Sequence, residues 1–513
     1  MPEKHNKSLP SYSSSYWREA DTEKRFSPLE EDVEVDTAVV GGGIAGILTT
    51  YYLCLEGKKT ALIEGSSLLD GTTGFTTAKV TPQHDVMYDQ LINNRGEEAA
   101  GLYYEAQVEA MAGIKELIHD LNIDCEHKAQ NAVLHAGTEE GKKQLEKEKK
   151  AYDKLKIGSE FTSDTELPFQ TKASLTMKNA FHFHPVKFLK PVINEIERLG
   201  GLIFENSTAV NISGGETVQV KLRNDCTVTC KHAVMATHFP FDDIRGFYFS
   251  RLHPERSYTI AVKTNKEVPE GMFLGIDNPA FSLRHTEING EKIALIGGEG
   301  HKTGKSSNTL AHYQNLADFT DKHFGIDKIL YRWSSQDLKA PDNVPLIGPA
   351  ITGRENILTA SGFKKWGMSN GMVSARLITD YIAGRSNSYA ELFDPRRSHL
   401  QGEDIKNLAK EIMDDGKQFV ASNVRGKEAA IDNLSIDEGA IVKINGKKAG
   451  AYRDSNGELH LVDPTCTHMK CGVEWNNAER TWDCPCHGSR FSIDGEVVEG
   501  PASTPLDKVN NDK

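Results

Sequence analysis

The largely apolar stretch at residues 35–40 is the first strong hydrophobic signal in the chain, after a polar arm rich in Ser, Glu and Lys. Apolar residues at helical spacing follow at residues 47–55, and a second short apolar run lies at residues 60–63. Short apolar runs bounded by turn residues are typical of strands that are buried on both faces. The pattern therefore predicts a strand–helix–strand unit with two parallel strands.

Most of the central chain divides into charged helices and alternating strands. Residues 96–160 carry Lys and Glu at helical spacing, for example at residues 141–155, which is typical of a solvated helix face. Between residues 245 and 335 short strands alternate with turns, as expected for an antiparallel domain. The other predicted elements are a strand entering a helix at 181–199, strands at 202–205, 209–210, 217–222, 227–230, 233–235 and 356–360, helices at 372–382 and 404–415, and strands at 440–443 and 459–462.

Composition and charge limit the possible classes of protein. A chain of 513 residues is too long for one core, so two or three folding units are expected. The formal net charge of −13 argues against a general nucleic-acid-binding protein, which needs a basic surface. No stretch approaches about 18 uninterrupted apolar residues, so no membrane span is expected. The N-terminus lacks an apolar signal region and the 8 cysteines do not form a secreted framework, so we expect a cytoplasmic location.

The segment between the first strand and the first helix has the glycine spacing G-x-G-x-x-G, at Gly41, Gly43 and Gly46. The first glycine turns the chain, the second lets backbone approach a pyrophosphate, and the third lets helix and strand pack. Glu64, at the end of the second strand, can accept hydrogen bonds from the ribose hydroxyls of an adenosine. This order predicts a dinucleotide site, and the alternative is a glycine-rich turn without a ligand.

Two short Cys–His segments near the C-terminus, residues 466–471 and 484–489, can present thiolates and imidazoles to one inorganic centre. Thiolates suit one iron of a [2Fe-2S] cluster and imidazoles the other, which is the ligation of a Rieske centre. Residues 466–501 resemble the Rieske iron–sulfur domain. The resemblance implies the cluster ligands Cys466, His468, Cys484 and His487, and a disulfide between Cys471 and Cys486. The alternative, a structural zinc site, does not explain Gly488-Ser489 or the Gly500-Pro501 loop.

The resemblance also bears on the reduction potential of the cluster. In high-potential Rieske proteins of respiratory complexes, a serine after the Cys-x-x-His-Gly run and a tyrosine two residues later donate hydrogen bonds to the cluster and its cysteine sulfur. Here Ser489 keeps the first hydroxyl, whereas Phe491 stands at the second position. We therefore expect a potential below the respiratory type.

Residues 71–79, Gly-Thr-Thr-Gly-Phe-Thr-Thr-Ala-Lys, form a loop of small residues that lets backbone amides approach a cofactor. With the glycine fingerprint, residues 35 to about 385 resemble the FAD-dependent oxidoreductases of the D-amino-acid oxidase, glycine oxidase and sarcosine oxidase group. The usual Asn-Gly-Gly ending of the loop is Thr77-Ala78-Lys79 here. By this resemblance the expected FAD contacts are Thr73, Gly74, Thr76 and Thr77, the backbone of Val210 at the adenine, Ala236 and Thr237 beside the cofactor, and Gly362, Gly367 and Met368 in the last flavin loop.

The catalytic residues stay open at this stage. Arg284 could bind a substrate carboxylate through a bidentate pair, and Lys364 could place a positive charge near the flavin ring. A surface position is the alternative for each of them. The resemblance implies that the flavin performs most of the chemistry while the protein orients the substrate.

The predicted fold is an α/β FAD-binding, Rossmann-like domain with an antiparallel-sheet substrate domain, followed by a small all-β Rieske domain. The FAD-binding parts are placed at about 35–95, 180–240 and 340–385, and the substrate-domain parts at about 96–179 and 241–339. The other predicted segments are an N-terminal arm at 1–34, a linker at 386–420 and the Rieske domain at 421–513.

The predicted function is that of an amine or amino-acid dehydrogenase. Electrons pass from the flavin to the [2Fe-2S] cluster and leave from an exposed histidine edge to an acceptor protein or quinone. One alternative is an NAD(P)H-dependent reductase that feeds the cluster, although this would need a second dinucleotide fold and the sequence has one glycine fingerprint. The other is a redox-sensing or electron-carrier protein without substrate turnover.

Overall fold

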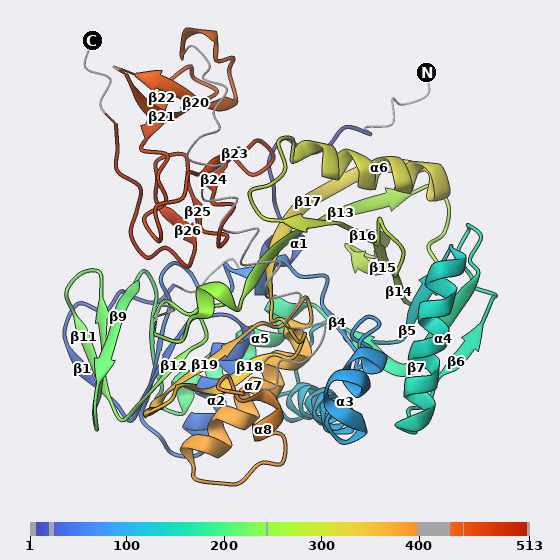
Figure 1. Ribbon diagram of the computed structural model, residues 1–513, viewed down its shortest axis with the longest axis horizontal. Coiled ribbons are helices and arrows are strands. Elements are labelled where there is room, and N and C mark those ends of the chain that lie inside the picture. Colours follow the sequence, from blue (N-terminus) through green and yellow to red (C-terminus); the bar gives the residue numbers. More distant parts are fainter. Residues whose placement is uncertain (1–6, 20–24, 243–244, 398–430, 445, 510–513) are drawn as a thin grey trace.

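The computed structural model describes residues 7–19, 25–242, 245–397, 431–444 and 446–509. Figure 1 shows a lower unit that contains the first strands, an upper unit built on a large sheet, and the C-terminal strands as a separate unit beside the latter.

A six-stranded sheet with the order β18-β19-β12-β2-β3-β8 forms the centre of the lower unit. Its strands are β2 (Thr37–Val40), β3 (Thr60–Ile63), β8 (Leu202–Phe204), β12 (His232–Met235), β18 (Leu346–Ile351) and β19 (Arg354–Ser361). All neighbouring pairs are parallel except β18 with β19. The strand–helix–strand unit predicted from the hydrophobic pattern is therefore β2, α2 (Ile44–Leu55) and β3.

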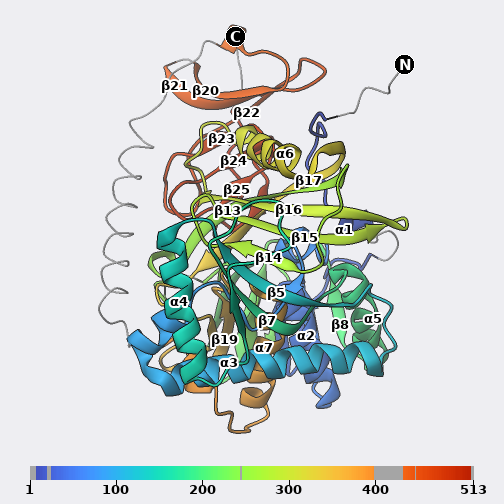
Figure 2. The same ribbon diagram turned by 90° about the vertical axis from the view of Figure 1, so that its right-hand side faces the viewer.

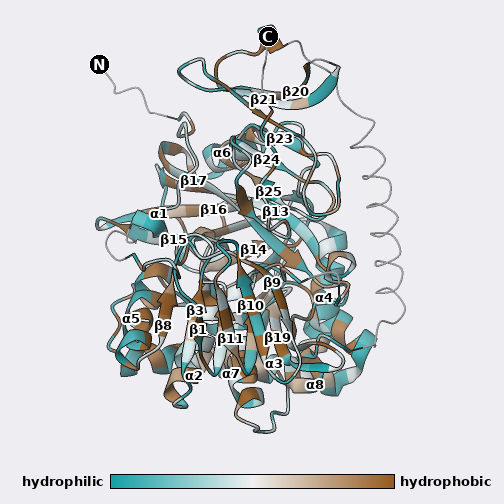
Figure 3. Cartoon of the chain, turned by 90° about the vertical axis from the view of Figure 1, so that its left-hand side faces the viewer, coloured by the Kyte–Doolittle hydropathy of each residue, from teal (hydrophilic) through white to brown (hydrophobic). Residues whose placement is uncertain are grey.

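Both faces of this sheet are covered, which explains why its strands are continuously apolar. On one face, Val39 packs in the core that contains α2, α5 (Pro185–Arg198) and α7 (Gly367–Ile382). On the other face, Ala38 and Val40 pack against a four-stranded sheet. That sheet has the order β1 (Val33–Glu34), β11 (Thr227–Cys230), β10 (Val218–Leu222) and β9 (Ala209–Gly214). Figure 3 shows the apolar positions gathered along the strands of this unit.

A nine-stranded sheet forms the upper unit, with β6 attached to the path β17-β13-β16-β15-β14-β5-β7-β4. Neighbouring strands are antiparallel except β5 with β14. Its strands are β4 (Lys79–Val80), β5 (Lys128–Ala136), β6 (Glu160–Thr162), β7 (Ala173–His182), β13 (His253–Thr264), β14 (Met272–Gly275), β15 (Phe281–Ile288), β16 (Glu291–Lys302) and β17 (Ile326–Lys339). The predicted combination of a parallel-sheet domain with an antiparallel-sheet domain is confirmed.

The prediction was wrong for two elements of the upper unit. β5 lies within the stretch predicted as charged helices, between α3 (Tyr88–Asp120) and α4 (Glu139–Lys154), because its apolar centre is buried between β7 and β14. α6 (Leu310–Phe324) lies within the stretch predicted as strands and turns, and its buried face packs on β13 and β16. Figure 2 shows α3 running along the base of the molecule and α6 above the large sheet. None of the described helices, including the long α3, has the length and apolarity to cross a membrane.

The C-terminal unit is all β apart from a short 3-10 turn at Ile431–Asn433. One small sheet has the order β20 (Glu438–Ile444), β21 (Lys447–Arg453) and β22 (Leu459–Val462). The other has the order β23 (Glu474–Asn476), β24 (Thr481–Asp483), β25 (Arg490–Phe491) and β26 (Val497–Glu499). The predicted all-β domain is confirmed.

The described part of the N-terminal arm packs between the other units. Trp17, in α1 (Tyr16–Glu19), is fully buried and donates from its indole N–H to the carbonyl O of Thr76 at 2.7 Å. Ser11 accepts at its carbonyl O from Arg332 of the upper unit and from Arg480 of the C-terminal unit. The arm therefore contacts the loop at residues 71–79 and is bonded to both the upper unit and the C-terminal unit.

The segment predicted as a linker is only partly described. Residues 386–397 contain α8 (Ala390–Phe393), and Arg397 forms a buried ion pair with Asp342 at 2.9 Å. The rest of the predicted linker, including the predicted helix at 404–415, lies outside the described residues.

Candidate functional site

The loop between β2 and α2 brings bare backbone to the place where the sequence predicts a pyrophosphate. Gly41 has φ +113°, and a Cβ there would lie 2.4 Å from the carbonyl O of Ala236. A Cβ at Gly46 would lie 1.9 Å from the carbonyl O of Gly41, so this glycine lets α2 pack on the loop. Gly43, the N-cap residue of α2, has no side chain, and the N–H of Ile44 in the first turn donates to the hydroxyl of Thr73 at 3.0 Å. The other first-turn N–H groups and the helix dipole are arranged as in an anion site.

Glu64 lies beside this loop at the end of β3. Its Oε2 accepts from the N–H of Gly42 at 2.7 Å and its Oε1 from the N–H of Ser66 at 2.8 Å. Burial raises the pKa of Glu64, while these N–H groups oppose the shift. A carboxylate has about four acceptor positions, so this side chain retains capacity for ribose hydroxyls.

A cavity of about 1280 Å³ opens from the glycine loop toward the nine-stranded sheet. Of the residues predicted to contact FAD, those lining it are Gly41, Gly43, Glu64, Thr73, Thr76, Thr77, Ala236, Thr237, Gly367 and Met368. They come from the C-terminal ends of strands, the loop containing the 3-10 turn Thr72–Phe75, and the start of α7. The glycine loop, the N-terminus of α2 and this cavity fit FAD.

The other residues predicted to contact FAD do not line the cavity. Gly46 and Gly74 have packing roles, because a Cβ at Gly74 would lie 2.3 Å from the carbonyl O of Leu69. Gly362 has φ +75°, which favours glycine in the turn after β19. Val210 lies in β9, directly after the lining residues Thr208 and Ala209. Their FAD contacts remain a prediction.

Neither sequence candidate for catalysis lines the cavity. Arg284 is buried, and it donates to the carbonyl O atoms of Thr77 at 2.6 Å and His285 at 2.8 Å. It therefore holds the loop predicted to lie along the flavin, and its role toward a substrate stays a prediction. Burial lowers the pKa of Lys364, and its place in the cavity wall is taken by the neighbouring Lys365.

Lys79 is a cavity residue that the sequence reasoning missed. Its Nζ donates to the carbonyl O of Phe273 at 2.9 Å and to the hydroxyl of Ser282 at 2.5 Å. Burial, and then the charge of Arg284, lower the pKa of Lys79 to about 7. The signal was present in the sequence, since Lys79 replaces a glycine that usually ends this loop in the resembling family.

The four predicted cluster ligands come together in the C-terminal unit. Cys466 and Cys484 are buried, and their sulfur atoms are within hydrogen-bond reach of each other. The rings of His468 and His487 lie 5.1 Å apart and nearly perpendicular. Among the described residues, the buried Nδ1 of His487 has no hydrogen-bond partner, as expected for an atom kept for a metal. Two thiols and two imidazoles in one place fit a Rieske [2Fe-2S] cluster.

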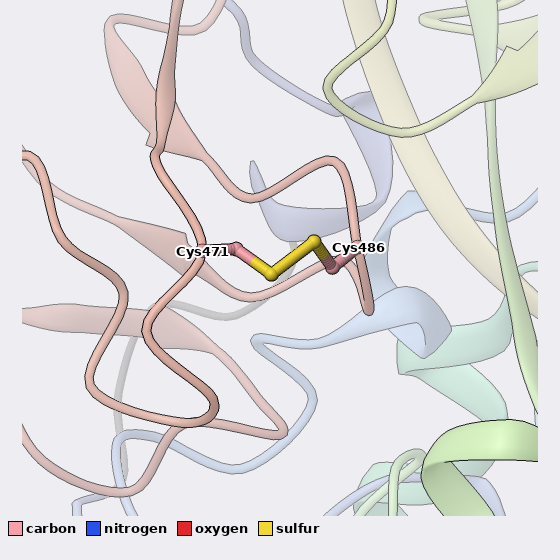
Figure 4. Close-up of a disulfide and its surroundings, with 2 residues drawn as sticks. All are labelled: Cys471 and Cys486. Carbon is pink, nitrogen blue, oxygen red and sulfur yellow. A yellow bond between two sulfur atoms is a disulfide. The ribbon is translucent and has the colours of Figure 1, made fainter. Parts of the chain in front are cut away.

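A disulfide joins the two ligand loops. Figure 4 shows the bond between Cys471 and Cys486, the pair implied by the resemblance. These sulfurs lie within 4.8 Å of the sulfur of Cys484, but a disulfide sulfur is not a thiolate ligand. The buried hydroxyl of Ser489 is within hydrogen-bond reach of the Cys466 sulfur and accepts from the N–H of Ala502 at 3.0 Å. Phe491 is fully buried in the apolar cluster of this unit.

The C-terminal unit closes one side of the same cavity. Thr481, Arg490 and residues 496–503 line it together with the predicted flavin contacts. Thr309 at the start of α6 is bonded to the side chains of Asn476 and Asn477, and Arg256 of β13 contacts Glu499 of β26. One cavity is therefore lined both by predicted flavin contacts and by residues of the C-terminal unit.

The expectation of an exposed histidine edge is wrong for His487. This side chain is only 7 % exposed, and its ring lies 5.9 Å from that of Phe249 in the flavoprotein part. His468 is half-buried, and the next residue, Met469, is exposed. The His487 side of the cluster site thus faces the flavoprotein part, and the His468 side lies nearer to solvent.

Comparison with known proteins places both parts of the chain. Residues 36–381 match the family described as FAD dependent oxidoreductase, and residues 427–510 match the Rieske [2Fe-2S] domain. The chain is 42% identical over 498 residues, 97% of its length and 98% of the relative's, to YhfW of Bacillus subtilis (strain 168), whose name describes a Rieske 2Fe-2S iron-sulfur protein. It is 23% identical over 402 residues to the gamma-glutamylputrescine oxidoreductase of Escherichia coli (strain K12), which covers 74% of this chain and 90% of that protein.

Solved structures agree with the fold. Glycine oxidase from Geobacillus kaustophilus superimposes with a TM-score of 0.60 at 14% identity, covering 71% of this chain and 99% of that one. L-amino acid deaminase from Proteus vulgaris gives a TM-score of 0.59 at 14% identity, covering 73% and 99%. Taken with the glycine loop, the cavity and the four predicted cluster ligands, these matches show that the chain belongs to the FAD dependent oxidoreductase family and carries a C-terminal Rieske [2Fe-2S] domain.

Proposed function

We propose that this chain is an amine or amino-acid dehydrogenase whose electrons leave through its own Rieske domain. The observation that carries the proposal is the shared cavity, which is lined on one side by the nucleotide fingerprint and on the other by residues 496–503 of the Rieske domain. Two domains that worked independently within one chain would not need to line the same cavity. The relationship to amine and amino-acid oxidoreductases supplies the substrate class.

The bound FAD supplies hydride acceptance from a C–N bond, and the [2Fe-2S] cluster supplies a one-electron exit. The chain itself offers groups that can bind and orient a substrate. His312 is hydrogen-bonded to Glu299 at 2.9 Å, and the hydroxyl of Tyr258 is hydrogen-bonded to His301 at 2.9 Å. All four residues line the cavity, and the carboxylate of Glu299 and the hydroxyl oxygen of Tyr258 have acceptor positions that suit an ammonium group.

Lys79 supports an anionic end for the substrate. Two of the three Nζ protons are used by Phe273 and Ser282, so one donor is left for a ligand. A carboxylate next to it would favour the protonated lysine and raise its pKa from about 7. An amino acid, with one cationic and one anionic group, matches this pair of features.

The electron acceptor would approach from outside the shared cavity. His487 is enclosed by the flavoprotein part, whereas Met469, next to His468, is 41% exposed. We infer that an acceptor protein or quinone meets the cluster on the His468 side. Such an outlet favours a dehydrogenase over an oxidase that consumes oxygen.

Anaerobic reduction of the holoprotein tests this function. A panel of amines and amino acids is mixed with the protein beside NADH and NADPH, and the flavin absorbance and the cluster EPR signal are recorded together. We expect a member of the amine panel to bleach the flavin and to produce the reduced-cluster signal. Bleaching by NADH or NADPH alone would show a reductase instead, and no bleaching by either class would favour a redox sensor or carrier.

A further inference from the structure

One residue of β17 is bonded to both cofactor regions. The carbonyl O of Gln336 accepts from the hydroxyl of Thr72, in the loop predicted to lie along the flavin, at 3.1 Å. Its side-chain Nε2 donates to the carbonyl O of Gly488, directly after the cluster ligand His487, at 3.0 Å. Its Oε1 accepts from the hydroxyl of Thr303 at 2.7 Å. Gln336 is 1% exposed, so every polar group of this side chain is paired inside the interface.

Two glycines let the domains approach closely at this point. Gly488 has φ +78°, and a Cβ there would lie 2.6 Å from Cβ of Pro254 and 2.8 Å from Oε1 of Gln336. On the other side, Gly304 has φ +71°, and its Cβ would lie 2.7 Å from Cα of Pro485 in the cluster loop. Each domain thus has a glycine at the position where the other domain comes closest. The contact is built for the cluster loop to touch β13 and β17 directly.

We propose that Gln336 is a positioning residue that holds the His487 loop against the flavin loop, in the arrangement that electron transfer between the two cofactors requires. The inference rests on the proposed function, since it assigns a role within that transfer. It differs from general domain docking because other contacts, such as Thr309 with Asn477, hold the domains together elsewhere. Gln336 sets the local position of the loop that carries a cluster ligand.

Removing the amide should loosen this one loop. Gln336→Met keeps the length and neutrality of the side chain but leaves the carbonyl O of Gly488 and the hydroxyl of Thr303 without their partner. Gln336→Glu keeps the acceptor for Thr303 and loses the donor to Gly488. A buried hydrogen bond lost in this way lowers the population of the positioned loop by about tenfold. Gly304→Ala, which pushes a methyl group against Pro485, should have the same consequence from the other side.

Asn477→Ala is the matched control. It removes an interface contact of Thr309 without touching the cluster loops. A decrease common to Asn477→Ala and the Gln336 variants would reflect weaker docking of the whole domain. A decrease confined to the Gln336 and Gly304 variants would reflect the position of the cluster loop.

The experiment is anaerobic flash photolysis with deazaflavin and EDTA on holoprotein of measured FAD and iron content. EDTA is oxidised, the photoreduced deazaflavin delivers one electron to the protein, and redistribution of that electron between flavin and cluster is followed by absorbance. Redistribution inside one molecule has a rate that does not depend on protein concentration. Dye-mediated titration by EPR gives the cluster potential as a second measurement.

We expect Gln336→Met and Gln336→Glu to slow the concentration-independent phase by about tenfold, and Asn477→Ala to change it by less than about twofold. The cluster potential should fall in Gln336→Met, because an N–H donor beside a ligand stabilises the reduced state. Unchanged rates in both Gln336 variants would overturn the inference and leave the proposed function standing. If the wild type itself lacked this phase, the proposed function would fail and the inference with it.

If Gln336→Met loses the cluster, Thr303→Val becomes the variant that tests the inference. That variant keeps Gln336 and removes only the hydroxyl that orients its amide. A slower phase with intact cofactors would support the inference, and a wild-type rate would overturn it.

Discussion

The two cofactor sites of this chain are built in opposite ways. The predicted FAD contacts that line the cavity are spread between residues 41 and 368 and belong to strand ends, a loop and the start of a helix. The predicted cluster ligands lie between residues 466 and 487 on two loops joined by a disulfide. The first site depends on how a whole sheet is assembled, and the second on local chemistry within a small domain.

The two sites also differ in the structural features that maintain them. In the flavin region, glycines allow two backbone segments to come into direct contact. A methyl group added at such a glycine would clash with a backbone carbonyl oxygen. In the cluster region, the disulfide Cys471–Cys486 joins the two loops that carry the predicted ligands. If the sites are independent, each can be destroyed while the other survives, although the domains share a cavity wall.

His487→Ala should give the largest effect, a complete loss of the cluster. A Rieske centre that lacks one imidazole loses a ligand that neighbouring side chains cannot replace. FAD should stay bound, because the glycine loop and its sheet belong to a separate core. Iron content, EPR and flavin absorbance on the purified variant test this. His460→Ala is the control, since His460 lies in the same domain and is bonded to Asp494. Loss of both cofactors together would contradict independence.

Gly46→Ala is the reciprocal change, with weaker FAD binding and retention of iron. The new Cβ would lie 1.9 Å from the carbonyl O of Gly41, and the backbone on both sides cannot move freely. Overpacking of this kind costs about 1–3 kcal/mol, which weakens FAD binding by about tenfold or more. Gly71→Ala is the control, because a Cβ there meets nothing within 4 Å. Equal FAD affinity in the two variants would show that α2 packing does not shape the site.

The same contrast explains how much the sequence could predict. The cluster site could be predicted because its residues lie within the short segment 466–489, and because ligand chemistry restricts the residue types. The strand, glycines, helix and Glu64 were readable for the same reason. Arg284 and Lys364 were harder, because an isolated charged residue carries no local sign of its burial.

The errors in the fold have a related cause. β5 and α6 were missed since their local patterns are outweighed by neighbours distant in sequence, which bury the centre of β5 and one face of α6. Contacts between the domains, such as that of Gln336 with Gly488, cannot be read from either partner alone. Sequence therefore predicted the local site well and the assembled one in outline.

Replacing both disulfide cysteines by serine should destabilise the cluster region by about 3 kcal/mol. The bond closes a loop of 15 residues, for which the chain-entropy estimate is about that size. The flavin region has no part in this loop, so heating should release the cluster earlier and leave flavin release unchanged. Cluster and flavin absorbance during one thermal scan measure both. Alkylation of native protein followed by mass mapping checks the bond itself, and free labelling of Cys471 and Cys486 with an intact cluster would contradict it.

Ser489→Ala should lower the cluster potential, and Phe491→Tyr should raise it. The Ser489 hydroxyl reaches the Cys466 sulfur, and a donor to sulfur stabilises the reduced cluster. A hydrogen bond of about 1.4 kcal/mol corresponds to about 60 mV for one electron. Phe491 is buried in the same apolar cluster, so a hydroxyl there would sit in a low-dielectric site. EPR-monitored titration decides, and unchanged potentials in both variants would show that neither position reaches the cluster.

Lys79→Met tests the flavin cavity through a small effect of pH on stability. Burial lowers the pKa of Lys79 to about 7, whereas an unfolded lysine has a pKa of about 10.4. Between these values the unfolded state binds more protons, so this residue makes stability rise with pH, and its full penalty is present below pH 7. Methionine removes the penalty, and its advantage should be largest near pH 6 and shrink toward pH 10. We expect a gain of about 2 °C in melting temperature at pH 6, with Lys365→Met, an exposed lysine of the same cavity, as the baseline. A gain that stays constant from pH 6 to pH 10 would mean that Lys79 is not buried as a neutral amine, and the cavity would then be more open to water than its lining implies.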